Sequence, residues 1–145
     1  MKYYWLRYKD NTGNANGYAK GLVITINSKH KGNEALLEHE KTHVRQWWAL
    51  AIPSVIAFVT AAPYLHELAF ILLGAFALTG HNLLYTVSKR YRLYSEVQAF
   101  TNQLNMQNGV GIYNAAKAIA ENYNLDVDFD TALKLLRRRT KRSIP

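Results

Sequence analysis

The N-terminal part of the chain has the alternating pattern of short β-strands. Residues 2–8 are rich in aromatic side chains that alternate loosely with polar ones, which predicts a first strand. The next segment, 10–17, is dense in Asn, Gly and Asp and is typical of a turn. A second strand is expected at about 18–27, because alternate positions from Leu22 to Ile26 are apolar. These segments predict a β-hairpin with a long loop, and two strands alone are stable only when they pack on helices.

A helical pattern follows the second strand. After a turn at 28–32, Asn33 is a suitable N-cap residue, and the apolar positions beyond it recur with helical spacing. We therefore expect a helix that runs to about Leu50. Its apolar stripe consists of Leu36, Leu37, Val44 and Trp47.

The segment 49–85 differs in composition from the rest of the chain. It contains one formally charged residue, Glu67, and the turn 63–67 divides it into two apolar halves, 49–65 and 68–85. Each half is at the lower end of the length that spans a bilayer as a helix. Two interpretations are open. The halves are either a helix pair buried in a soluble core, for which a homodimer could supply cover, or a helical hairpin that crosses a membrane twice.

The residues that flank this apolar hairpin favour the membrane interpretation. Aromatic and basic side chains stand at both of its ends, and the connecting turn has neither Lys nor Arg. Such flanks are typical of the cytoplasmic boundary of a bilayer. We therefore expect a lipid bilayer as a partner, with both long ends of the chain on the cytoplasmic side; without insertion the protein would be cytoplasmic. The flanking residues are Arg45, Trp47, Trp48, Tyr85, Lys89, Arg90 and Arg92.

Three more helices complete the expected elements. The first covers about 86–106 and ends at the pair Asn108-Gly109, which is a helix-stop signal. The second covers 112–123, and the third covers 131–139 with Asp130 as its cap. The chain thus reads as an N-terminal β-hairpin, a helix, an apolar helical hairpin and further helices with a basic C-terminal end.

Length and composition agree with one domain over residues 1–145, of the α+β class and mainly helical. The chain has no cysteine, so a disulfide or a thiolate metal site is excluded, and any metal must be held by His, Asp or Glu. The formal net charge is +8, with much of the excess at 89–92 and between Arg137 and Arg142. Such clusters meet nucleic acid or anionic lipid, or are simply solvated. Nucleic acid is the less favoured partner, because the arginine run is not interleaved with aromatic residues in a binding motif.

The sequence His39-Glu40-Lys41-Thr42-His43 has the pattern H-E-x-x-H within the first predicted helix. Residues four positions apart share one face of a helix, so the two imidazoles can hold a single zinc ion. Glu40 is then placed to take a proton from a zinc-bound water. The pattern predicts one Zn²⁺ ion with His39 and His43 as ligands and Glu40 as general base. The alternative is a surface helix with two histidines and a glutamate that bind nothing.

A catalytic zinc ion needs a third protein ligand and an open position. Glu96 is the first choice, because it lies in a predicted helix and Ala99, on the same face, would let that helix pack closely on the histidine-bearing one. His81 is the best rival, as a ligand, as a group that supports a ligand, or as a packed helix histidine. His66 and Glu67 are expected to be polar turn residues of the apolar hairpin.

With a helical Glu96 after His39-Glu40-x-x-His43, the chain resembles the gluzincin zinc metallopeptidases. The apolar hairpin between these elements is similar to the membrane-bound branch that includes the HtpX and Ste24 proteases. Short phage and bacterial HExxH proteins are an equally good comparison. The resemblance covers about 22–103. It implies that His39, His43 and Glu96 bind zinc and that Glu40 acts as base and proton shuttle.

Other residues are candidates for contact with a substrate. Tyr91 or Tyr94 could stabilise the oxyanion of a tetrahedral intermediate, or both could be ordinary packing residues of their helix. A peptide substrate could also add to the edge of the second strand through main-chain hydrogen bonds. The residues of this expected edge are Leu22, Val23, Ile24, Thr25 and Ile26.

The function expected from these features is zinc-dependent hydrolysis of a peptide bond, in a peptide or protein substrate, by metal-activated water. The first alternative is a membrane hairpin protein without catalysis, for example one encoded by a phage, whose HExxH is incidental or structural. The second alternative is a basic nucleic-acid-binding module. The oligomeric state is open, and a homo-oligomer is one option.

Overall fold

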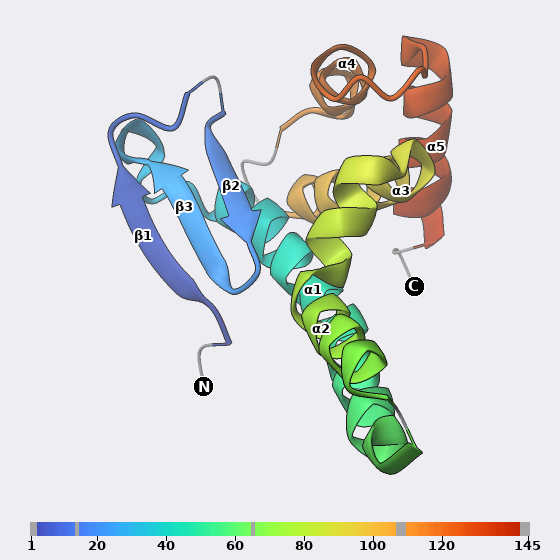
Figure 1. The fold of residues 1–145 in the computed structure, drawn as a ribbon. Coiled ribbons are helices and arrows are strands. Elements are labelled where there is room, and N and C mark those ends of the chain that lie inside the picture. The colour runs from blue at the N-terminus through green and yellow to red at the C-terminus, as the bar shows by residue number, and fades with distance from the viewer. Residues whose placement is uncertain (1–2, 14, 65, 107–109, 143–145) are drawn as a thin grey trace.

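A computed structural model describes residues 3–13, 15–64, 66–106 and 110–142 (Figure 1). The fold is α+β and mainly helical, as the sequence predicts, with three strands and five α-helices among the described residues. The strands are β1 (Trp5–Lys9), β2 (Gly17–Lys20) and β3 (Val23–Asn27), followed by a 3₁₀ turn at Ser28–His30. The helices are α1 (Glu34–Ala61), α2 (Glu67–Val87), α3 (Lys89–Leu104), α4 (Ile112–Asn122) and α5 (Phe129–Arg142), with a second 3₁₀ turn at Ala62–Tyr64.

The sheet does not have the predicted topology. The expected second strand, 18–27, is two strands, because Gly21, with a φ of 57°, makes a tight turn between β2 and β3. These two strands form the antiparallel hairpin, and β1 pairs with β3 in parallel, so the strand order is β1-β3-β2. The predicted hairpin between the first and second strands was therefore wrong.

The side chain of Asn27, at the end of β3, holds the loop that carries the chain from β1 across to β2. Its amide donates to the carbonyl of Asp10 at 3.3 Å and to the hydroxyl of Thr12 at 3.2 Å.

Ile24 and Ile26 make β3 the most apolar strand, so the central position in the sheet buries it best.

Helix α1 is the central element of the fold. The sheet lies against one side of its N-terminal half, and α3, with α4 and α5 beyond it, lies on the other side (Figure 1). Asn33 caps the helix as predicted, because its side chain accepts a hydrogen bond from the Leu36 amide at 2.9 Å. Ile24 and Ile26 of β3 pack on Val44 of α1, which fixes the helix against the sheet.

Helix α1 does not end near Leu50 but continues to Ala61. Pro53 lies inside it and removes one backbone hydrogen bond without ending the helix. The HExxH segment and the first half of the apolar hairpin are therefore parts of one continuous helix.

Helix α2 returns along α1, and the pair projects away from the rest of the molecule (Figure 1). Gly74 allows close packing, because a Cβ there would lie 3.3 Å from the ring of Phe58. Only 6% of the apolar window in α1 and 17% of that in α2 are buried, so the single chain does not enclose this hairpin. Its exposed large apolar residues include Ile52, Val55, Ile56, Val59, Ile71, Leu72, Leu78 and Leu83.

The helices after the hairpin differ from the prediction mainly at their ends. The helix expected from Thr86 is divided, because α2 runs on to Val87 and Ser88 caps a new helix, α3, by accepting from the Tyr91 amide. The expected stop signal at 108–109 lies outside the described residues. Helix α4 agrees with the prediction to within one residue.

Helix α5 begins two residues earlier than predicted, and its cap is Asp128 rather than Asp130. The Asp128 carboxylate accepts from the Thr131 amide at 2.7 Å, and Asp130 lies in the first turn. Helices α3, α4 and α5 share a core that is separate from the sheet. Its fully or nearly buried residues include Val97, Phe100, Ala115, Ile119, Leu133 and Leu136.

Candidate metal centre

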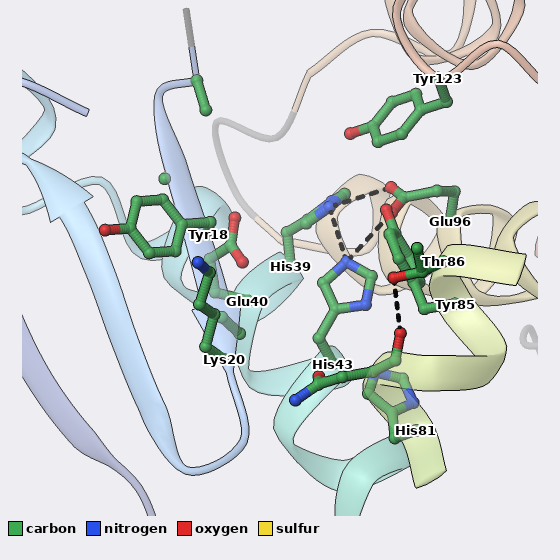
Figure 2. Close-up of a pocket in the computed structure, with 14 residues that line it drawn as sticks. Tyr18, Lys20, His39, Glu40, His43, His81, Tyr85, Thr86, Glu96 and Tyr123 are labelled. Atoms are coloured by element: carbon green, nitrogen blue, oxygen red, sulfur yellow. Dashed lines mark hydrogen bonds and ion pairs between the residues drawn. The ribbon is translucent and has the colours of Figure 1, made fainter. Parts of the chain in front are cut away.

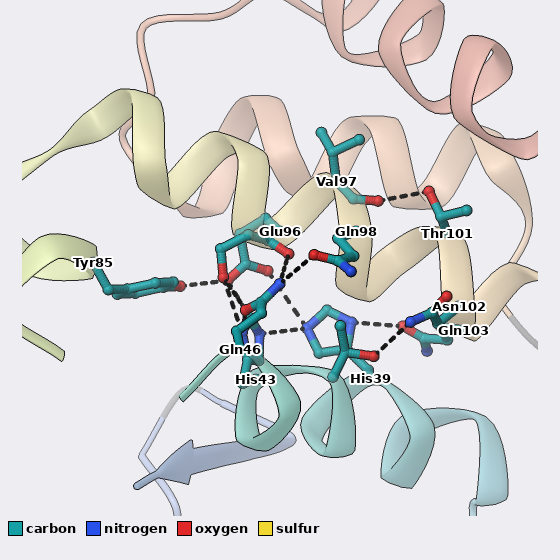
Figure 3. Close-up of polar contacts among 12 residues, drawn as sticks. His39, His43, Gln46, Tyr85, Glu96, Val97, Gln98, Thr101, Asn102 and Gln103 are labelled. Carbon is teal, nitrogen blue, oxygen red and sulfur yellow. Dashed lines mark hydrogen bonds and ion pairs between the residues drawn. The ribbon is translucent and has the colours of Figure 1, made fainter. Parts of the chain in front are cut away.

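Helices α1 and α3 bring the three predicted ligands together. The Nε2 atoms of His39 and His43 lie 3.3 Å apart, as expected for two residues one turn apart on α1. The carboxylate of Glu96, on α3, reaches both: Oε2 is 3.4 Å from His39 Nε2 and Oε1 is 3.4 Å from His43 Nε2 (Figures 2 and 3). All three residues are buried.

These separations fit a zinc ion. Ligand atoms at about 2.0–2.1 Å from a tetrahedral ion stand about 3.3–3.4 Å from one another, because the edge of a tetrahedron is about 1.6 times the distance to its centre. The distance between the two Nε2 atoms and the distance from each Nε2 to its nearer Glu96 oxygen have about this value, with Oε2 next to His39 and Oε1 next to His43. Within the described part of the chain, the group consists of two imidazoles and one carboxylate, which leaves a fourth position for water or substrate.

Hydrogen bonds on the far side of each imidazole set its tautomer. His39 Nδ1 lies 3.1 Å from Gln103 Oε1, and His43 Nδ1 lies 3.1 Å from Gln46 Oε1 and from Ser95 Oγ (Figure 3). An amide oxygen only accepts, so each Nδ1 carries a proton, and with a metal ion bound each Nε2 would turn its lone pair to the ion.

These supporting residues were not among those predicted from the sequence. Their positions carried a signal, since Gln46 lies one turn after His43 on α1 and Gln103 lies two turns after Glu96 on α3. The same face of each helix therefore holds both a ligand and the group that orients a ligand.

Glu96 is held as an anion. Burial alone would raise the pKa of its carboxyl group, but His43, His39 and the hydrogen bond from Tyr85 together lower that pKa to about 2. The Tyr85 hydroxyl donates to Oε1. The other oxygen, Oε2, is buried and lies 3.4 Å from His39 Nε2, and it has no hydrogen bond of good geometry from any residue that the structure describes. A buried anionic oxygen that is incompletely paired is costly, and a bound cation would remove that cost.

The carboxylate of Glu40 lies on the β2 side of the two histidines and faces the cleft (Figure 2). Burial raises the pKa of Glu40 to about 7, with a further increase from Glu96 and a partial decrease from His39. A general base works best when its pKa is near the working pH, so this environment suits proton transfer. Gly17 of β2 leaves the room that Glu40 occupies, because a Cβ there would lie 3.3 Å from Glu40 Oε1.

A cleft extends from the candidate centre in two directions. A cavity of about 550 Å³ reaches toward α2 and is bounded there by His81, Asn82 and Thr86. A second cavity of about 690 Å³ reaches toward α4 and is bounded by Asn114 and Glu121. Both cavities are lined by Ala15, Gly17, His39, Glu40 and Tyr123.

Strand β2, not the predicted edge strand, borders this cleft. The edge assigned to residues 22–26 was wrong, because β3 is the central strand and pairs on both sides. The amide of Asn27 donates to the carbonyl of Asn16 at 2.9 Å, and hydrogen-bonded pairs alternate with non-bonded ones in an antiparallel ladder. Gly17 and Ala19 therefore direct their backbone N–H and C=O groups away from β3, on the side of the cleft.

The auxiliary candidates have different positions from one another. His81 is buried and lines the cleft, with its Nδ1 2.7 Å from the hydroxyl of Tyr91, but it is not part of the ligand group. Tyr91 thus contacts His81 and does not line either cavity at the centre. Tyr94 is 54% exposed and packs under Arg139, so the geometry does not support an oxyanion role for it.

Two other tyrosines, rather than Tyr91 and Tyr94, lie beside the candidate centre. Tyr85, at the end of α2, contacts Glu96, and Tyr123, just after α4, points its hydroxyl into the cleft above His39 and Glu96 (Figure 2). Tyr85 had been assigned to a membrane boundary, and Tyr123 had no assigned role. No local pattern marks either residue, because both reach the centre through the packing of distant helices.

Compared with known proteins, the chain matches no family model, no curated protein and no solved structure.

Proposed function

We propose that this protein is a zinc-dependent peptidase that hydrolyses peptide bonds with metal-activated water. The observation that carries the proposal is the set of 3.3–3.4 Å separations among His39 Nε2, His43 Nε2 and the Glu96 carboxylate. Among the described residues the group offers three protein ligands, which is typical of a catalytic zinc ion, whereas structural zinc ions have four protein ligands. This favours catalysis over a structural metal site.

Each residue has a role that its surroundings support. His39, His43 and Glu96 would hold the ion, which supplies a water of lowered pKa and polarises the scissile carbonyl. Glu40 accepts the proton of the attacking water and then passes it to the amine that leaves when the C–N bond breaks. The hydroxyl of Tyr123 is the donor best placed over the centre to stabilise the developing oxyanion.

The substrate is proposed to be an extended polypeptide that is cleaved within its length. The cleft continues on both sides of the candidate centre, toward α2 and toward α4, so chain on either side of the scissile bond has space. The backbone groups of Gly17 and Ala19 can pair with such a chain as an added strand. This proposal moves the substrate-binding edge from residues 22–26 to β2.

The apolar hairpin is proposed to cross a lipid bilayer twice, with both chain ends on the cytoplasmic side. Two helices long and apolar enough to span, with most of their apolar surface exposed, support insertion. Arg45, Lys89 and Arg90 at the base of the hairpin agree with a cytoplasmic boundary there. The candidate centre would then lie just below the membrane surface.

The test of the proposed function combines metal analysis with cleavage. We expect the purified protein to contain about one zinc ion per chain, His43→Ala to lose it, and Glu40→Gln to retain it but to lose cleavage of an unstructured polypeptide. Glu38→Gln is a matched control, since Glu38 pairs with Arg45 away from the centre and should keep both zinc and turnover. Equal zinc in the wild type and His43→Ala, or full cleavage by Glu40→Gln, would contradict the proposal.

A further inference from the structure

The side chain of Arg92 joins the ends of two helices near the candidate centre. Its Nε donates to the carbonyl of Tyr85 at 2.7 Å, Nη2 to that of Thr86 at 2.7 Å, and Nη1 to that of Tyr123 at 3.3 Å. The first two carbonyls belong to the last turn of α2, and the third follows the end of α4. Carbonyls in the last turn of a helix have no partner within the helix, so a guanidinium with several donors satisfies them well.

The same guanidinium lies over the ring of Tyr85, 5.2 Å from its centroid. Arg92 therefore contacts both the backbone and the ring of the residue whose hydroxyl donates to Glu96 Oε1. Arg92 and Glu96 are also one turn apart on α3 and share a face of that helix. The contacts form a closed circuit, from Arg92 to Tyr85, from Tyr85 to Glu96, and back along α3.

We propose that Arg92 is a positioning residue for the metal centre, which acts through Tyr85 on the carboxylate of Glu96. This inference depends on the proposed function, because it requires the metal site. The Glu96 side chain has several rotatable bonds, and the hydrogen bond from Tyr85 selects one orientation of its carboxylate. That bond is directional only while the Tyr85 ring is itself held, which the contacts of Arg92 achieve.

Arg92 could instead only hold the ends of α2 and α4 together, without orienting Tyr85. A second contact in the same region distinguishes these two roles. Lys89, also on α3, pairs with Asp126 in the loop between α4 and α5, and both residues are exposed. This ion pair links the start of α3 to the same loop that Arg92 reaches through Tyr123, and it is not among the described polar and ring contacts of Tyr85. Lys89→Gln is therefore a matched control for loosening of that corner.

The experiment measures the zinc affinity of the full-length chain by competition with a chromophoric chelator. Arg92→Lys keeps the charge but not the forked contacts, and Tyr85→Phe removes one hydroxyl. We expect each to weaken zinc binding about tenfold or more. The double variant should bind zinc no more than about twofold less tightly than the single variant with the lower zinc affinity, because both changes interrupt the same chain of contacts. Lys89→Gln should bind zinc as the wild type does.

Several results would overturn the inference. One is a zinc affinity of Tyr85→Phe within about twofold of the wild type, a result that does not depend on whether Arg92→Lys folds. Another is a double variant in which the two losses multiply, since Arg92 would then act independently of Tyr85. If Lys89→Gln loses as much zinc affinity as Arg92→Lys, Arg92 only holds these helix ends together and does not orient Tyr85. Failure of the wild type to bind zinc is a distinct outcome, which contradicts the proposed function itself.

Discussion

A single charge in the apolar part of α2 should decide whether the apolar hairpin lies in lipid. Leu72 lies about midway between the hairpin turn and Leu78, whose carbonyl accepts from Trp47 Nε1 at 3.0 Å at the base of the hairpin. Leu72 is 62% exposed, so its side chain would face the acyl chains of a bilayer. We predict that Leu72→Lys prevents stable insertion. Val87→Lys is the matched control, because Val87 is equally apolar and 67% exposed but is the last residue of α2, where a lysine reaches the interface.

The magnitude follows from the composition of the helix. Each Leu, Ile, Phe or Val contributes about −0.3 to −0.6 kcal/mol to insertion, so the residues of this kind in 69–87 together supply about −3 to −5 kcal/mol. A lysine at the centre costs about 2.5–3.5 kcal/mol, and the leucine is lost as well. One substitution therefore removes most of the apolar driving force of α2. The residues counted are Phe70, Ile71, Leu72, Leu73, Phe76, Leu78, Leu83, Leu84 and Val87.

The absence of native cysteine permits a direct assay of topology. Tyr64, 87% exposed in the turn of the hairpin, is replaced by Cys and labelled in intact cells with a membrane-impermeant thiol reagent. We expect labelling of Tyr64→Cys alone and with Val87→Lys, and none when Leu72→Lys is added. Tyr113→Cys, on α4, should stay unlabelled because the proposed topology puts this exposed residue on the cytoplasmic side.

The refuting results are equally specific. If Tyr64→Cys is not labelled and the protein stays in the soluble fraction, the hairpin is not inserted. If Leu72→Lys then dissociates a soluble oligomer, a second copy of the chain covers the apolar surface instead. Unchanged membrane association and labelling of the Leu72→Lys variant would refute the energetic argument.

Two further predictions concern the centre and its base. Gln103→Leu removes the acceptor of His39 Nδ1, so in chelator competition it should weaken zinc binding about 10- to 100-fold, or about 1.4–2.7 kcal/mol. The control is Asn102→Leu, because the Asn102 amide contacts α1 away from the imidazoles. Equal zinc affinities of the two variants would contradict the role of Gln103. Gly17→Ala places a methyl group 3.2 Å from the carbonyl of Thr25 and 3.3 Å from Glu40 Oε1, so turnover should fall about tenfold or more while zinc content is unchanged. Full turnover in Gly17→Ala would show that the position of Glu40 does not depend on this space.

Local sequence patterns predicted correctly those helix ends that depend on local interactions. The Asn33 cap and the start of α4 follow from nearest-neighbour hydrogen bonding and periodicity. The predicted ends of other elements were wrong because they depend on tertiary packing. Ser88 and Asp128 cap α3 and α5, yet polar residues nearby offered equally good caps, and the chain's tertiary packing selected between them.

The residues of the candidate centre also differ in whether local sequence or tertiary packing determines them. His39, Glu40 and His43 were identified from spacing alone, because one helical turn places both imidazoles on a single face whatever the rest of the fold does. Glu96 was selected from several acidic and histidine candidates by its expected helix, and its distance to the histidines depends on the packing of α3 on α1. No local rule sets the distance between side chains 53 to 57 positions apart.

What the sequence determined by itself is therefore the set of features with a short range: the helical HExxH segment, the apolar composition of the hairpin, and the α+β class. Only the tertiary structure decided that β2 is the edge beside the cleft and that Tyr85 and Tyr123, rather than Tyr91 and Tyr94, face the centre. Strand order and helix packing depend on which apolar faces bury each other best over the whole chain, and that comparison cannot be made from any one segment.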